Sequence, residues 1–133
     1  MDYSKLSDFE INKAVAEIAI NGDWLLEPTD ESPSWFFNHG VQGKNTVKLP
    51  DYCNSPADAW PIISANRISV EYDSGDQCDV PAEWVTAYGI DGLKVHIVAH
   101  QPCDKALRSA MIVFLMMQES ANVPVNSKRS DLR

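Results

Sequence analysis

The chain has 133 residues, 44% of them hydrophobic, which is enough to bury the core of one domain without a metal or disulfides. Its formal net charge is −8, and an acidic chain is a poor match for nucleic acid, whose phosphates bind cationic side chains. The longest apolar run, Ala110 to Met117, is far shorter than the roughly 20 residues that a membrane span needs, so the sequence predicts no span.

A helix is predicted from Ser7 to about Ile20. Ser7 and Glu10 have the spacing of a capping box, in which the serine hydroxyl accepts from the glutamate amide and the carboxylate reaches back to the serine amide. Asn21 and Gly22 supply the stop signal. The residues before Ile11 are polar and acidic, unlike a secretory signal peptide, so we expect a cytoplasmic protein.

A short strand is expected from Asp23 to Glu27, and a long polar segment follows it. That segment holds three consecutive aromatic residues, Trp35, Phe36 and Phe37. Aromatic residues in such a loop usually pack back onto the core. Together with His39 and Trp60 they would also suit a small-molecule pocket, which is typically apolar with a few polar groups. A lone histidine in a loop specifies no reaction.

The stretch "NSPADAWPIISAN" predicts a short helix from Ser55 to Asn66 despite its two prolines. Ser55 is suited to cap the helix, and Pro56 to its first position, where no amide is needed. Pro61 would kink or tighten the helix. The expected inner-face residues are Ala57, Trp60 and Ile63. We interpret the segment as a framework helix whose tryptophan ring packs onto the sheet.

Three strands are predicted next, because the apolar period changes from helical to alternating. Ile68, Val70 and Tyr72 alternate with polar residues, and a second alternating run ends at Tyr88. Asp91-Gly92 is a strong hairpin signal before a third run, from Lys94 to His100. Sequential strands joined by short turns predict an antiparallel meander.

Four acidic residues around the first of these turns are candidates for a recognition surface: Asp73, Asp76, Asp79 and Glu83. A calcium loop is rejected because an EF-hand needs glycine at its sixth position and glutamate at its twelfth, where this chain has Cys78 and Trp84. A DNA mimic would need a longer acidic row. We expect a charged turn that a protein with a basic surface would recognise.

The last predicted helix runs from about Cys103 to Ser120 and is apolar nearly all round. It is therefore either central to the fold or buried against a second chain, which would make a homodimer near Met116. Residues after Ala121 show no core-forming period. We expect a single domain over 1–120 and a disordered tail over 121–133.

No residue cluster in the sequence specifies catalysis, a metal or a cofactor. His96 and His100 would point to one face of a strand, but four residues along a strand span about 13 Å, too far to share an ion. The three cysteines, Cys53, Cys78 and Cys103, are widely spaced, so we expect reduced thiols and no zinc site. The sequence contains no phosphate-loop, hydrolase or metalloprotease motif.

Three stretches resemble the NinX-like family of lambdoid-phage proteins, which are small proteins of unknown function. They are Leu6 to Glu17, Asp51 to Ser69 and Leu107 to Ser120. The order of elements is also similar to the phage ABA-sandwich domain. The resemblance implies a small antiparallel sheet sandwiched between helices and transfers no catalytic residues. It agrees with the α+β fold that the residues themselves predict.

Three functions stay open. The first is a non-enzymatic phage accessory protein that binds a host or phage protein, to modulate the host or counter its defences. The second is a small-ligand-binding domain or minor enzyme with an aromatic-lined pocket. The third is a homo-oligomeric structural module. None of them implies a cofactor or a direct contact with nucleic acid.

Overall fold

The computed structural model describes residues 2–20, 22–24, 27–30, 35–38, 45–73 and 83–122. Its helices are α1 (Asp8–Ala19), α2 (Pro56–Ala65) and α3 (Ala106–Asn122), with short 3₁₀ helices at Tyr3–Lys5 and Cys103–Lys105. Its strands are β1 (Gly22–Trp24), β2 (Trp35–Asn38), β3 (Asn45–Lys48), β4 (Ser69–Asp73), β5 (Trp84–Asp91) and β6 (Lys94–Pro102). They form two antiparallel sheets, β1-β2-β3 and β4-β5-β6.

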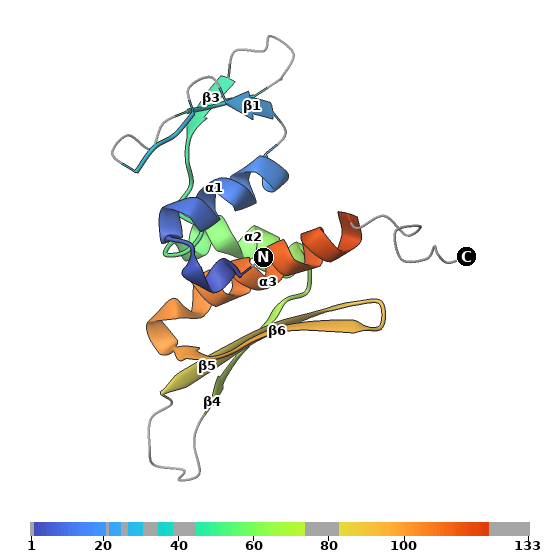
Figure 1. Cartoon of the computed structure of the whole chain (residues 1–133). Coiled ribbons are helices and arrows are strands. Elements are labelled where there is room, and N and C mark those ends of the chain that lie inside the picture. The colour runs from blue at the N-terminus through green and yellow to red at the C-terminus, as the bar shows by residue number, and fades with distance from the viewer. Residues whose placement is uncertain are drawn as a thin grey trace, which may run out of the picture.

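The helices lie together on one side of the β4-β5-β6 sheet (Figure 1). α3 lies directly on the sheet, and α1 and α2 pack against α3. The predicted α+β class and three-stranded antiparallel meander are confirmed. In the described part of the chain no helix covers the second face of this sheet, so the sheet is open on that side rather than enclosed between two helical layers.

α3 occupies the middle of the fold, which explains why its sequence is apolar nearly all round. Every residue from Ser109 to Leu115 is buried. Because other helices and the sheet cover α3 from different sides, its apolar residues are accounted for within one chain. A homodimer near the half-buried Met116 stays a prediction. Beyond Asn122, the tail expected over 121–133 lies outside the described residues.

The capping box predicted for α1 is present. The Glu10 amide donates to Ser7 Oγ at 3.1 Å, and the Ser7 amide donates to the Glu10 carboxylate at 2.8 Å. The fully buried residues of α1 are Ile11, Val15 and Ala16. These positions share one face of a helix, so the local cap and the apolar stripe together position α1 against the core.

α2 forms where predicted, but of its three expected inner-face residues only Ile63 is buried, whereas Ala57 and Trp60 are exposed. Ser55 Oγ accepts from the Asp58 amide at 3.3 Å, and Pro56 is the first helical residue. The buried residues are Ala59, Ile62 and Ile63. Trp60 is 63% exposed, so the expectation that its ring packs onto the sheet is wrong. One residue turns a helix by about 100°, which carries Trp60 away from the stripe that begins at Ala59.

The inner face of β5 is lined by residues small enough for α3 to approach closely: Val85, Ala87 and Gly89 are buried there. A Cβ on Gly89 would lie 2.6 Å from Met117 Sδ and 3.2 Å from Val113 Cγ1. The missing side chain of Gly89 therefore makes room for the helix. Since strand residues alternate between faces, this contact also establishes which side chains of β5 point outward.

Candidate functional site

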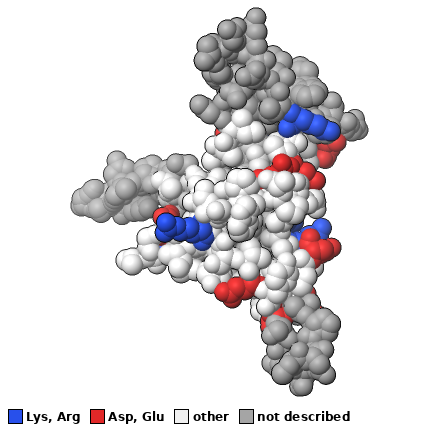
Figure 2. All heavy atoms as spheres, turned by 180° about the vertical axis from the view of Figure 1, so that it is seen from behind, with Lys and Arg blue, Asp and Glu red and all other residues white. Residues whose placement is uncertain are grey.

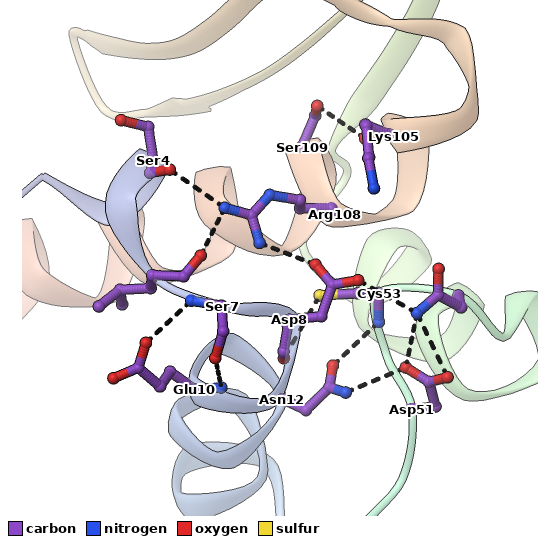
Figure 3. A network of polar contacts seen from close by, with 12 residues as sticks. Ser4, Ser7, Asp8, Glu10, Asn12, Asp51, Cys53, Lys105, Arg108 and Ser109 are labelled. Atoms are coloured by element: carbon purple, nitrogen blue, oxygen red, sulfur yellow. Dashed lines mark hydrogen bonds and ion pairs between the residues drawn. The ribbon is translucent and has the colours of Figure 1, made fainter. Parts of the chain in front are cut away.

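A network of polar contacts joins the segment before α1, the turn before α2 and the first turn of α3 (Figure 3). Arg108 Nη1 donates to Asp8 Oδ1 at 2.8 Å. Arg108 Nη2 donates to the carbonyl oxygens of Leu6 at 2.7 Å and Ser4 at 3.2 Å. A single guanidinium thus holds the entry to α1 against the central helix.

Asn12 extends this network into the turn at residues 51–54 (Figure 3). Its Nδ2 donates to Asp51 Oδ1 at 3.0 Å, and its Oδ1 accepts from the Cys53 amide at 3.0 Å. Asn54 Nδ2 reaches both carboxylates, at 3.3 Å from Asp8 Oδ2 and 3.1 Å from Asp51 Oδ1. Asn12 is buried, and these bonds satisfy a side-chain amide that would otherwise be costly to bury.

The protonation of two network residues follows from their surroundings. Burial alone would raise the pKa of Asp8, but hydrogen bonds from Arg108 and Asn54 and the charge of Arg108 outweigh it, so the pKa lies below its ordinary value. Burial, reinforced by the charge of Asp8, raises the pKa of Cys53 to about 12. Since the thiolate is the reactive form of cysteine, Cys53 is a protonated and unreactive thiol.

The network is best explained as a structural joint. Its carboxylates accept from a guanidinium or from amides, and its thiol is protonated, so these groups offer neither a general base nor a nucleophile. The segments it connects are the same three stretches that carry the family resemblance. In this chain the network therefore holds these three stretches together.

The predicted aromatic and acidic candidates are only partly described. Trp35, Phe36 and Phe37 lie in β2, between β1 and β3, and their side chains lie outside the described residues. His39, Asp76 and Asp79 lie outside them altogether. Asp73 and Glu83 are exposed at the end of β4 and just before β5. The aromatic pocket and the acidic recognition surface therefore stay predictions.

A β-bulge interrupts the pairing of β6 with β5. The pairs on its two sides are Ala87 with Val98 and Val85 with Gln101. Between them, Ala99 and His100 together oppose the single residue Thr86, which is the arrangement of a bulge. His100 has a φ of 58°, a left-handed conformation that is uncommon for a residue other than glycine.

The bulge places the two histidines of β6 on opposite faces, so the prediction that they share a face is wrong. His96 pairs with Gly89 and therefore lies on the inner face. The His100 ring lies beside the Trp84 ring on the outer face, with 6.4 Å between centroids. One extra residue reverses the alternation of side chains along a strand. Among the described residues, no group of three or more His, Cys, Asp or Glu could hold a metal ion.

The outer face of the sheet carries exposed apolar side chains on β5 and β6, which we call the outer strip. Its members are Trp84, Tyr88, Ile90, Val95 and Ile97. Pairing places Tyr88 opposite Ile97 and Ile90 opposite Val95. Their exposed fractions are 43% for Trp84, 62% for Ile90 and 52% for both Val95 and Ile97. A solvated sheet face is usually polar, so the outer strip is the candidate binding site.

Two carboxylates border the outer strip on β4. Glu71 pairs with Thr86 and Asp73 with Trp84, which places both on the outer face. The Tyr88 hydroxyl donates to the Glu71 carboxylate at 2.7 Å and so connects the strip to the acids. By register, no Lys or Arg of β4, β5 or β6 shares this face. The outer face is mainly apolar over β5 and β6 and carries the two acidic residues on β4.

The charged side chains visible from behind form small, separate groups of both signs, with wide areas of other residues between them (Figure 2). The described residues of that face therefore make no continuous acidic row of the kind that a DNA mimic needs. The helices of the described part of the chain are all too short or too polar to cross a membrane.

Sequence reasoning missed the outer strip because alternation in a strand identifies two faces without saying which is buried. Val95 and Ile97 alternate with more polar residues in the sequence, and both point outward in the structure. A usable signal was present in β5, where Ala87 and Gly89 occupy alternate positions. Small residues at alternate positions suit the close approach of another backbone. The side of β5 that carries them is the inner side, where α3 packs.

Comparisons with known proteins were consistent with this fold. The sequence matches the family model described as Bacteriophage P22, NinX over residues 2–118. The structure is similar to the crystal structure of a phage protein from Bacillus cereus ATCC 14579, with a TM-score of 0.55 and 14% identity over 88% of this chain and 97% of that one. At that identity the likeness shows the fold alone. A comparison with curated proteins gave no match.

Proposed function

The chain belongs to the Bacteriophage P22 NinX family, and we propose that it is a phage accessory protein that acts by binding a host or phage protein rather than by catalysis. The supporting observation is the outer strip. Four of its large apolar side chains are exposed, although the same chain buries a core of apolar residues. Contiguous apolar surface of this kind is typical of a protein-binding site.

Charge supports a partner with a basic surface. The chain has a net charge of −8, and the charged residues on the outer face, Glu71 and Asp73, are both acidic. Opposite charges steer two proteins together, and salt weakens that attraction. We propose modulation of a host pathway or defence as the role of the complex, because the family is a phage family.

The polar network supports a non-enzymatic function. Its carboxylates Asp8 and Asp51 already accept hydrogen bonds from within the chain. Burial first and the charge of Asp8 second raise the pKa of Cys53 to about 12. The thiol therefore stays protonated at neutral pH and does not act as a nucleophile.

Affinity capture with matched variants tests the proposal. The tagged protein is incubated with host lysate at low and high salt, and the retained proteins are identified by mass spectrometry. Ile97→Glu changes the outer strip, and Ile18→Glu makes the same change on α1, where Ile18 is also exposed. We expect a partner that the parent and Ile18→Glu retain, that Ile97→Glu loses and that high salt weakens. Equal retention by both variants would contradict the proposal.

A small-ligand site is a second candidate, supported by a hollow of about 420 Å³ between the three helices. Its lining is mainly apolar and includes Ile18, Tyr52, Pro61 and Phe114. Burial, reinforced by the charge of Asp58, raises the pKa of Tyr52 to about 12, so its hydroxyl stays protonated. A rise in melting temperature with small apolar molecules, lost in Ile18→Glu, would favour this function. An unchanged melting temperature with every molecule tested would contradict the small-ligand function.

A further inference from the structure

We infer that the partner lays one amphipathic helix along the outer strip, with Lys or Arg on a single flank of that helix. The inference rests on the proposed function and specifies the kind of partner. It uses two properties of the outer face: the dimensions of its apolar part, and the side on which its carboxylates lie.

The dimensions of the outer strip match one helix. The strip covers two strands, and along β5 it extends from Trp84 to Ile90. Neighbouring strands are about 4.8 Å apart and each residue advances about 3.3 Å, so the strip is about 10 Å wide where Tyr88 and Ile90 pair with Ile97 and Val95, and it continues along β5 to Trp84 for a total length of about 20 Å. A helix with its side chains is about 10 Å across, and about 13 residues span 20 Å. A second sheet would need apolar residues on β4 as well, where this face is acidic.

The other side of the same two strands already holds a helix. α3 packs on the inner face of β5 and β6 (Figure 1), with Val113 and Met117 over Gly89. One face of this strand pair thus already packs against a helix, and the outer strip offers a second face of similar width. A partner helix would restore the layer that the open side of the sheet lacks.

The carboxylates determine which flank of the partner helix is basic. Glu71 and Asp73 are two residues apart on β4, which is about 7 Å along the strand. Two residues four apart on a helix are about 6 Å apart along its axis, so one such pair of Lys or Arg would face both acids. The hydrogen bond from Tyr88 holds the Glu71 carboxylate beside the strip. On the opposite side, β6 contains no Asp or Glu.

The partner segment is therefore expected to have apolar residues at positions i, i+3, i+4 and i+7, with two basic residues four apart on one flank. A random library of displayed 16-residue peptides provides the test. It is selected on the full chain, on Ile97→Glu, on Ile18→Glu and on the double variant Glu71→Lys/Asp73→Lys. Fluorescence anisotropy then gives the dissociation constants of the enriched peptides.

We expect the parent and Ile18→Glu to enrich amphipathic helices with one basic flank. Ile97→Glu should weaken the binding of these peptides by more than tenfold, and the double charge variant should weaken it by about tenfold. Selection on the double charge variant should instead enrich helices with an acidic flank. Circular dichroism checks that each variant is folded, and Val95→Glu replaces Ile97→Glu if the latter is not. Failure to enrich any peptide, enrichment of extended or uncharged sequences, or an unchanged basic flank on the double variant would overturn the inference.

The two hypotheses fail in different ways. If lysate capture is lost in Ile97→Glu but the selected peptides show no basic flank, the helix inference is wrong and the proposed function stands. If Ile97→Glu keeps the lysate partner, the proposed function itself is wrong.

Discussion

Arg108 and Asp8 lie one hundred positions apart in the sequence, yet a guanidinium nitrogen of one is 2.8 Å from a carboxylate oxygen of the other. The same guanidinium donates to the carbonyl oxygens of Leu6 and Ser4. The start of α1 is thereby attached to α3, which in turn lies on the sheet. One side chain thus attaches the start of α1 to the helix that covers the sheet.

Arg108→Ala should lower the free energy of unfolding by about 2–3 kcal/mol, because it removes the charged donor from a partly buried carboxylate and from two carbonyl groups. Urea denaturation at neutral pH measures the loss. Lys13→Ala is the matched control, since Lys13 pairs with Glu27, whose side chain is mostly exposed, and its loss should cost under about 0.5 kcal/mol. Similar losses in the two variants would show that the Arg108 network contributes no more than a surface ion pair.

Acid should weaken the fold partly through Asp8. Its pKa is lowered in the folded protein, so the stability it provides is complete above its unfolded pKa, near 3.8, and is lost as the pH falls through the lower folded value. The Asp8→Asn variant has no carboxyl group to protonate at this position. Its unfolding free energy, measured by denaturation at a series of pH values, should therefore fall less steeply below about pH 4 than that of the parent. Parallel profiles would refute the assignment.

Trp60 and Ile63 lie in the same helix but should differ sharply as alanine variants. Trp60→Ala should cost under about 1 kcal/mol, because most of the ring is exposed. Ile63→Ala should cost about 2–4 kcal/mol, because Ile63 is buried and its loss leaves a cavity. Thermal and urea unfolding compare the two. A larger loss for Trp60→Ala would mean that the indole is buried in solution.

Gly89→Ala should destabilise the contact between β5 and α3 by about 1–2 kcal/mol, because the new methyl group would overlap Met117 Sδ and crowd Val113. In a Met117→Ala background the overlap with the thioether is gone, so the same glycine change should cost at least about 0.5 kcal/mol less. A double-mutant cycle of unfolding free energies gives this coupling. Strictly additive losses would rule out the contact.

Cys53 should resist alkylation while the protein is folded. It is buried and its pKa is raised to about 12, whereas Cys103 is only half-buried. In a Cys78→Ser background, iodoacetamide at about pH 8 should modify Cys103 first and Cys53 only in denaturant, since the thiolate reacts. Peptide mass spectrometry follows both sites. Modification of Cys53 at its unfolded rate would contradict both the burial and the shifted pKa.

Features that depend on nearby residues were predictable from the sequence. The capping box of Ser7 and Glu10 uses two residues three apart, and the hairpin at Asp91-Gly92 needs only its turn residues. The face of α2 was not predictable, because the position of α3 decides which stripe is covered. The bulge at His100 has no glycine to mark it. The contact between Arg108 and Asp8 joins residues 100 positions apart, so no local sequence pattern predicts it. The outer strip is exposed because α3 covers only one face of the sheet.

The bulge also affects how copies of this chain would meet one another. β6 is an edge of the sheet that the described residues form, and a straight edge strand is a template on which further strands can add. Here the regular row of backbone groups is broken at Ala99 and His100, the Gln101 side chain donates to the Ala99 carbonyl at 3.0 Å, and Pro102 has no amide to offer. Along this edge, a molecule that keeps apolar side chains in water therefore presents no regular template on which further copies could add.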